Sequence, residues 1–268
     1  GWSVDPGVRV GAEYKRSPFD LYVDGQRVTE PRVKTGFLDA VLGLGFGYGG
    51  LVGARLKIEA TESDEAATIE DWSGESQSFF SLSGILRFDS WDRAAFPRSG
   101  VALAAKSEWS LGALGGAGDD FSHHVLDVDA AIPLGDRVSL RARGITGTTD
   151  GADLPPAYQF FIGGANQFYL YPDRHFPFAG LRVQERRGRH LQSAQVGIQW
   201  EVVPSVFAVG RFNAAALPDE WRLDVDDWFT GFGAGVGLHT RFGSFRVMVT
   251  GGEVADAVRL EMDLGFPF

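Results

Sequence analysis

The chain has 268 residues, a formal net charge of −10 and no cysteine. An acidic chain without a continuous basic stripe argues against a nucleic-acid partner, and the absence of cysteine excludes disulfides and thiolate metal sites. Hydrophobic residues make up 44% and charged residues 22% of the chain, with 36 glycines and 13% aromatic residues. A barrel with one apolar face and one wet face is expected to average to this composition.

No linker or low-complexity tract divides the sequence, so one domain over residues 1–268 is expected. The first residues lack the charged and apolar regions of a signal peptide, which indicates a mature chain or an excised domain. Residues 40–54 are the best uncharged stretch, but they are rich in glycine and shorter than the ~20 apolar residues of a spanning helix. If the chain is integral to a membrane, only a closed barrel satisfies its backbone.

Apolar and polar residues alternate with period two through most of the chain, which predicts strands. In residues 257–268 the even positions are apolar, and the odd positions include Arg259, Glu261 and Asp263. The same alternation predicts about twelve strands, an even number as single-chain bacterial barrels require. They are expected near residues 7–16, 36–48, 50–61, 77–89, 100–111, 120–133, 137–148, 191–203, 205–215, 229–242, 244–252 and 257–268.

Tight turns and long polar connections alternate between these strands. The long connections are expected at residues 17–35, 62–76, 112–119, 149–190 and 216–228, with a shorter one at 253–256. Residues 20–28 are assigned to the first connection rather than to an extra strand. Outer-membrane barrels have short periplasmic turns and longer outside loops, so both termini are expected in the periplasm.

The predicted fold is all-β: a transmembrane antiparallel up-and-down β-barrel of the bacterial outer membrane, with the long extracellular loop 149–190 folded toward the lumen. A soluble β-sandwich or lipocalin also alternates, but it rarely sets so many charges of both signs opposite an apolar face with an aromatic rim. The apolar face is expected to meet outer-membrane lipid and lipopolysaccharide. The charged face is expected to line the lumen with Arg55, Lys57, Arg87, Arg141, Arg143, Glu201, Arg211, Arg241, Arg259, Glu261 and Asp263.

Phe266 and Phe268 stand on the apolar side of the last strand. They fit the terminal aromatic signal by which outer-membrane barrels are handed to their assembly machinery, so that machinery is an expected partner during biogenesis.

Residues 87–100 (RFDSWDRAAFPRSG) resemble a periplasmic turn of the Omp85 superfamily. The resemblance rests on a strand end followed by Asp89, Asp92, Arg93, Pro97 and Gly100. Pro97 prevents ladder pairing at the turn, and Gly100 permits a sharp entry into the next strand.

Residues 160–172 resemble the start of the family's long sixth extracellular loop, which folds back into the lumen. Five predicted strands follow it, as in the family, and the resemblance covers about residues 36–268, with strands missing on the N-terminal side. The residues expected in the lumen-directed loop include Gly163, Gly164, Tyr169 and Tyr171, and of residues 169–171 only Tyr171 matches the family pattern. The same connection contains five arginines: Arg174, Arg182, Arg186, Arg187 and Arg189. They could form a basic plug that pairs with lumenal carboxylates or binds an anionic headgroup. Alternatively, they belong to a solvated loop tip.

Two departures from the family pattern occur together. The family's loop carries Arg-Gly-(Tyr/Phe) after the glycine pair, where this chain has residues 169–171 (YLY). The wall strand that receives the arginine usually offers an aspartate, where this chain reads Phe212-Asn213-Ala214-Ala215. Loss of both partners of a buried ion pair can leave the stability nearly unchanged, whereas loss of one partner leaves the other charge buried and unpaired. We therefore expect the loop to plug the lumen without that ion pair.

The pattern is unlike an insertase or a secretion pore. It is most similar to the degenerate C-terminal barrel of bacterial patatin-like phospholipases, and this similarity implies an attached periplasmic or hydrolase domain. The chain itself has no catalytic motif: Asp150-Gly151-Ala152 matches the patatin aspartate motif, but the partner Gly-x-Ser-x-Gly is absent. Ser122 and His124 share a face near a rim, but the neighbouring His123 is expected in the lumen and no His-x-Ser-Asn-Gly-type run is present, so no catalysis is expected there. No metal site and no cofactor are expected.

The expected function is that of a plugged barrel that anchors or helps to translocate an attached or partner domain. The alternatives are a porin-like passive channel for small solutes and a structural barrel in a larger envelope complex. Glycines at alternate positions in residues 231–237 suit either close packing against a partner or bending of the strand, and we favour bending.

Overall fold

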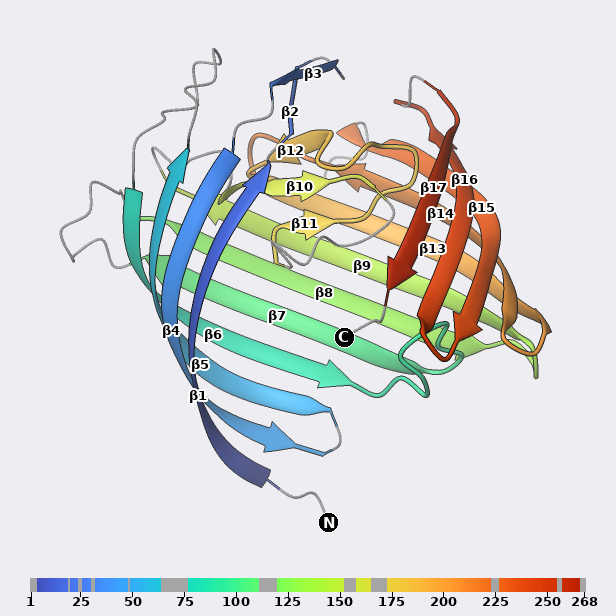
Figure 1. Ribbon diagram of the computed structural model, residues 1–268, viewed down its shortest axis with the longest axis horizontal. Coiled ribbons are helices and arrows are strands. Elements are labelled where there is room, and N and C mark those ends of the chain that lie inside the picture. The colour runs from blue at the N-terminus through green and yellow to red at the C-terminus, as the bar shows by residue number, and fades with distance from the viewer. Residues whose placement is uncertain are drawn as a thin grey trace.

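The computed structural model describes residues 4–18, 20–23, 26–29, 32–47, 49–63, 77–110, 120–151, 158–164, 173–222, 227–254 and 257–265. Twelve strands form one antiparallel sheet in which chain neighbours are also sheet neighbours (Figure 1). They are β1 (Val4–Pro18), β4 (Arg32–Phe46), β5 (Gly50–Ser63), β6 (Gln77–Asp89), β7 (Gly100–Ser110), β8 (Ser122–Pro133), β9 (Val138–Asp150), β13 (His190–Val203), β14 (Val206–Ala216), β15 (Phe229–Thr240), β16 (Gly243–Gly252) and β17 (Arg259–Gly265).

This arrangement confirms the predicted up-and-down barrel fold of twelve strands, and the strand ends differ from their expected positions by at most four residues. Residues 20–28 lie in the first long connection, where β2 (Leu21–Val23) and β3 (Gln26–Thr29) form a hairpin outside the large sheet. Within the described residues, no helix is long and apolar enough to cross a membrane.

The sheet curls around an interior space, here called the lumen, and β1 and β17 are its two edges (Figure 1). Among the described residues these edges do not pair with each other. The short links after β4, β6, β8, β13 and β15 all lie at one end of the sheet, the turn end, and the long connections lie at the other, the loop end. Both the start of β1 and the end of β17 lie at the turn end.

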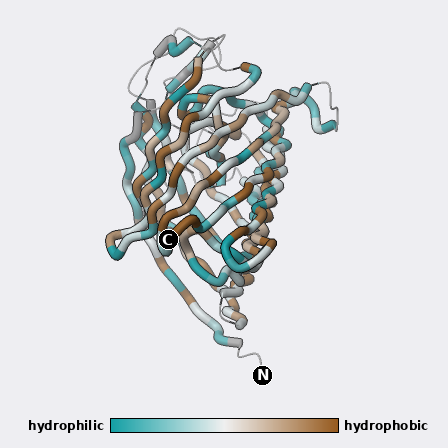
Figure 2. Tube along the Cα trace, turned by 90° about the vertical axis from the view of Figure 1, so that its right-hand side faces the viewer, coloured by the Kyte–Doolittle hydropathy of each residue, from teal (hydrophilic) through white to brown (hydrophobic). Residues whose placement is uncertain are grey.

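The outward face is apolar and unshielded. Leu260 is 64% and Met262 is 66% exposed on β17, and Ile198 is 52% exposed on β13. Their chain neighbours Glu261 and Gln199 turn inward, so apolar and polar segments alternate along the strands (Figure 2). A soluble sheet buries such side chains, whereas a membrane barrel presents them to lipid.

Ion pairs cover the inward face. Arginine and carboxylate groups approach to 2.6 Å in Arg141–Asp129 and Arg143–Asp127, 2.8 Å in Arg246–Asp263, 2.7 Å in Arg55–Asp39 and 3.3 Å in Arg211–Glu261. A cavity of about 1180 Å³ runs along the inner side of β1 and β4–β9. Arg55, Lys57, Arg87 and Arg143 are among the residues that line it.

Arg241 is a correction to the expected lumen lining. It lies in the turn after β15, exposed, with its guanidinium 4.7 Å from the centre of the Phe242 ring. β15 ends at Thr240, two residues before the expected strand end at residue 242, so Arg241 falls outside the alternation.

Ile198 lies near the middle of β13 and tests which face meets lipid. We expect Ile198→Arg to destabilise the barrel by about 2–4 kcal/mol, because an outward arginine near the bilayer midplane loses its hydration. Ala104→Lys is the matched control, since Ala104 lines the cavity in register with Asp127 and an added charge there stays hydrated. Equilibrium unfolding of both variants in lipid vesicles measures the difference. Equal losses would contradict this assignment of the faces.

Candidate functional site: a loop inserted into the lumen

The connection between β9 and β13 folds into the concave side of the sheet. Its described part contains β10 (Phe160–Ile162), β11 (His175–Phe176) and β12 (Arg186–Gly188), which form a small sheet in the order β11-β10-β12. Figure 1 shows this sheet inside the curve of the large one, toward the loop end. We call the described residues of this connection, 158–164 and 173–189, the lumenal loop.

The glycine pair Gly163-Gly164 lets the lumenal loop fold back on itself. Both residues have positive φ, +133° and +79°, which disfavours residues with a Cβ. A Cβ on Gly163 would also overlap the carbonyl of Arg182. The Gly164 amide donates to Leu181 O at 2.9 Å, and the Gly164 carbonyl accepts from the Phe178 amide at 3.1 Å. These contacts close the loop around its own apolar centre.

One side of the lumenal loop is apolar and packs against the sheet wall. Its buried side chains meet wall residues of β8, β9, β13, β14 and β15 in one cluster. The members are Phe160, Ile162, Phe176, Phe178 and Leu181 of the loop and Val125, Ile145, Leu191, Ala215 and Phe229 of the wall. Removing such rings and branched chains from water holds this side of the loop in place.

The other side of the loop is polar and meets β5, β6 and β7. The Tyr158 hydroxyl donates to Glu59 Oε1 at 2.6 Å, and Lys106 Nζ lies 2.5 Å from Asp173 Oδ2. The Arg174 guanidinium lies over the Tyr158 ring, 4.1 Å from its centre. The Tyr158 ring also packs against Phe79 and Phe121. This wall therefore adds polar and charged contacts to apolar packing.

The wall beneath Tyr158 and Asp173 carries a buried network of charges. Lys57 Nζ lies 2.5 Å from Glu59 and 2.9 Å from Glu108, and Lys106 also contacts Glu108. The Ser81 hydroxyl donates to Glu108 Oε1 at 2.7 Å. Together with the loop residues Asp173 and Arg174, these side chains carry three positive and three negative charges, and we call them the charge cluster. Buried charges are tolerated when they are paired and hydrogen-bonded in this way.

His123, fully buried on β8, connects this cluster to the loop backbone. Its Nδ1 lies 2.7 Å from Thr149 Oγ1 and its Nε2 lies 3.2 Å from the Asp173 carbonyl oxygen. Because a carbonyl only accepts, the network assigns the proton to Nε2. The ring also stacks on Phe160, with 4.8 Å between centroids.

Burial and charge set the ionisation of the loop side chains. Burial alone would favour the neutral form of Asp173, but Lys106 and Arg174 hold the pKa of its carboxyl well below the usual range. Burial and the neighbouring Glu59 carboxylate raise the pKa of the Tyr158 hydroxyl, so it remains a donor. Burial lowers the pKa of His175 to about 4.

Asn213 of β14 contacts the lumenal loop. Its side chain is buried, and its Oδ1 accepts from the Ala179 amide at 3.2 Å. Its Nδ2 has no hydrogen-bond partner among the described residues. A neutral hydrogen bond therefore joins β14 to the loop. Charged contacts to the loop lie on β7, through Lys106, and on β17, where Arg259 lies 3.9 Å from Glu185.

The expected loop arginines occupy different places. Arg174 is buried within the charge cluster. Arg186 is exposed, over the Phe229 ring at 4.7 Å, and Arg187 is half-buried in register with Phe161. Tyr169 and Tyr171 lie outside the described residues, as do Phe266 and Phe268.

Tyr158 and Asp173 were not anticipated from the sequence. Neither belongs to a periodic strand or a recognisable motif. The inward alternation of Lys57 and Glu59 was the only sequence signal for the wall that they contact.

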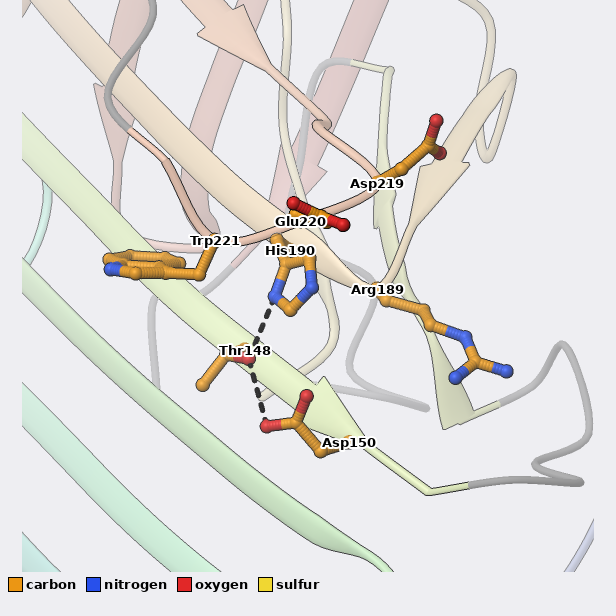
Figure 3. Close-up of a pocket in the computed structure, with 7 residues that line it drawn as sticks. All are labelled: Thr148, Asp150, Arg189, His190, Asp219, Glu220 and Trp221. Carbon is orange, nitrogen blue, oxygen red and sulfur yellow. Dashed lines mark hydrogen bonds between the residues drawn. The ribbon is translucent and has the colours of Figure 1, made fainter.

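A shallow pocket of about 550 Å³ lies at the loop end, outside the charge cluster (Figure 3). The Thr148 hydroxyl donates to Asp150 Oδ2 at 3.3 Å and lies 2.8 Å from His190 Nδ1. A catalytic triad needs the imidazole between the hydroxyl and the carboxylate, but here the hydroxyl is in the middle. His124, considered above with Ser122, instead contacts Ser107 at 2.5 Å. Neither arrangement supports nucleophilic catalysis.

Comparison with known proteins gives a consistent match. A model of the OMP85 superfamily matches residues 34–268. The solved structure of BamA from Haemophilus ducreyi lacking POTRA domains 1–3 is similar over 98% of this chain and 59% of that chain, with a TM-score of 0.71 and 12% identity.

CdiB from Escherichia coli matches 97% of this chain and 49% of its own, with a TM-score of 0.59 and 14% identity. CdiB from Acinetobacter baumannii matches 97% and 46%, with a TM-score of 0.55 and 14% identity. The chain therefore spans roughly half the length of these proteins. None of the curated proteins matches it.

Arg174 tests whether the charge cluster holds the loop. We expect Arg174→Ala to weaken loop docking by about 3–5 kcal/mol, because it leaves a buried cluster with one uncompensated negative charge. Hydrogen exchange of the amides of residues 173–188 measures docking. Arg186→Ala is the control, since it removes only an exposed ring contact worth about 0.5–1 kcal/mol. The cluster would have no such role if both variants exchanged alike.

His175 makes loop docking sensitive to pH. Its pKa is about 4 in the docked loop against an ordinary 6.5, so between these values the undocked loop binds a proton that the docked loop does not. Falling pH in this window therefore favours undocking, while Asp173 stays ionised. We expect loop amides to lose protection from pH 7 to pH 4.5, after correction for intrinsic exchange. His175→Asn should reduce that loss, and protection equal at both pH values would refute the account.

Proposed function

This chain belongs to the OMP85 superfamily, and on that premise we propose that it is a plugged outer-membrane barrel that anchors or helps to translocate an attached or partner domain. The docking of the lumenal loop on two opposite walls carries the proposal. The apolar cluster fixes one side and the charge cluster the other. An open channel for solutes would not bury so many side chains of a loop in its lumen.

An attached domain fits the position of the termini. β1 begins and β17 ends at the turn end, so a domain joined at either terminus emerges there. We assign the turn end to the periplasm, where short links are expected, and the loop end to the outside. The sequence resemblance to patatin-like phospholipase barrels favours a hydrolase and a periplasmic domain on the N-terminal side.

The reading frame upstream of Gly1 tests this attachment. A hydrolase with a Gly-x-Ser-x-Gly elbow there would support the patatin-like assignment. A signal peptide directly before Gly1 would instead make the chain a free-standing barrel, and the partner would then have to be a separate protein. The barrel assembly machinery and the lipid and lipopolysaccharide around the outer face remain expected partners of either form.

A passive porin is the second candidate, favoured by the cavity of about 1180 Å³ along β1 and β4–β9. Conductance separates the two functions. In planar bilayers we expect the wild-type barrel to give small, flickering openings, because the lumenal loop occupies the lumen. Replacing residues 158–188 by a short Gly-Ser link should give large, steady openings. Large, steady openings of the wild type would favour the porin, and heat-modifiable gel mobility checks that the shortened variant is folded.

A further inference from the structure

The turn after β6, residues 90–99, reaches across the turn end of the lumen. It begins beside β7, yet it contacts β13, β14 and β15, the last of which lies five strands further along the sheet. Figure 1 shows this turn near the lower ends of β15 and β16. A connection between adjacent strands needs no such reach, so these contacts require their own explanation.

Phe96 is the centre of the crossing. It has a φ of +51°, an unfavourable value for a residue with a Cβ. Its ring stacks on the buried Phe207 ring of β14 with 4.4 Å between centroids and an interplanar angle of 10°. A Cβ added to Gly237 on β15 would overlap the same ring. The ring therefore fills a slot that exists only because residue 237 is glycine.

Polar contacts support the ring on both sides. Gln199 Nε2 of β13 donates to the carbonyls of Phe96 at 3.0 Å and Pro97 at 3.1 Å. Arg93 lies 3.8 Å from Glu201, and Arg98 donates to the Gly135 carbonyl at 3.0 Å. The turn thus contacts the β8–β9 turn and the strands β9, β13, β14 and β15.

The turn is also a preformed unit. The Asp92 carboxylate accepts the amides of Arg98 at 2.8 Å and Ser99 at 3.2 Å, and the Asp89 carboxylate accepts the Trp91 amide at 2.8 Å. Gly100 has a φ of +112° at the junction with β7. Local hydrogen bonds hold the shape of the turn, whereas the contacts to β13–β15 hold its position.

We propose that residues 90–99 are a latch that closes the turn end of the lumen on the β13–β15 side and opens when the Phe96 ring leaves its slot. Release allows the strained φ of Phe96 to relax, while the internal hydrogen bonds of the turn remain. Closed, the latch contacts Gln199, whose Nε2 also donates to the Ser139 hydroxyl at 3.1 Å, and Ser139 beside it is 1% exposed. This closure is separate from the lumenal loop at the opposite end.

The absence of cysteine makes the test direct. Ser139→Cys places one thiol beneath the latch, and its rate of modification by a hydrophilic maleimide in detergent reports opening. Gly237→Leu, which fills the slot, and Phe96→Gly, which removes the ring, should each raise the rate roughly tenfold or more. Gly7→Leu is the matched control, because Gly7 is a lumenal glycine with open space at its Cβ. Gel mobility confirms that each variant is folded.

Folded Gly237→Leu and Phe96→Gly variants that both react within about twofold of the parent would overturn the latch. Their combination should react no faster than the faster single variant, since both remove one contact, and an additive increase would also overturn it. Arg174→Ala in the same background should leave the Ser139→Cys rate unchanged. A faster modification of Ser139→Cys in the Arg174→Ala variant would show that the latch and the lumenal loop open together, and would overturn their independence. This result does not depend on the conductance measurement.

Discussion

The structure depends on one constraint: every strand must present a lipid-compatible face and a wet face at the same time. Period-two alternation meets it, and it forces nearly all charge onto the concave side. Pairs such as Arg143–Asp127 and Arg246–Asp263 follow, because charges confined to a narrow interior must neutralise one another. The interior is therefore crowded with ionic groups before any inserted segment enters it.

The lumenal loop makes different contacts on the two sides of that interior. Against β8, β9 and β13–β15 it brings aromatic rings, and against β5–β7 it brings Tyr158, Asp173 and Arg174. On β14 the contact is neutral, between Asn213 and the Ala179 amide. Its charged contacts lie on β7, where Lys106 meets Asp173, and on β17, where Arg259 lies 3.9 Å from Glu185.

The strands could be predicted from sequence because alternation is a local property, visible within one segment. The inward placement of Arg55 and Lys57 followed for the same reason. Tyr158 and Phe96 could not be anticipated, since their contacts join segments about a hundred positions apart and have no period. The prediction that Arg241 lines the lumen was wrong because alternation does not mark where a strand ends.

The glycines of β15 show the same limit. Bending of the strand was the favoured explanation, yet Gly231 leaves room for the Ala179 carbonyl of the lumenal loop and Gly237 for the Phe96 ring. Their role depends on which distant segment passes over them. A sequence pattern alone does not contain that information.

The sequence separation of these contacts has a kinetic consequence. Tyr158 and Glu59 are 99 positions apart, and Gln199 and Phe96 are 103 apart, so neither contact can form until strands from both halves of the chain have been assembled. Filling of the interior is thus a late event in biogenesis. Intermediates that lack the C-terminal strands would expose Phe96 and the loop aromatics to proteases and chaperones, which would distinguish unfinished molecules from finished ones.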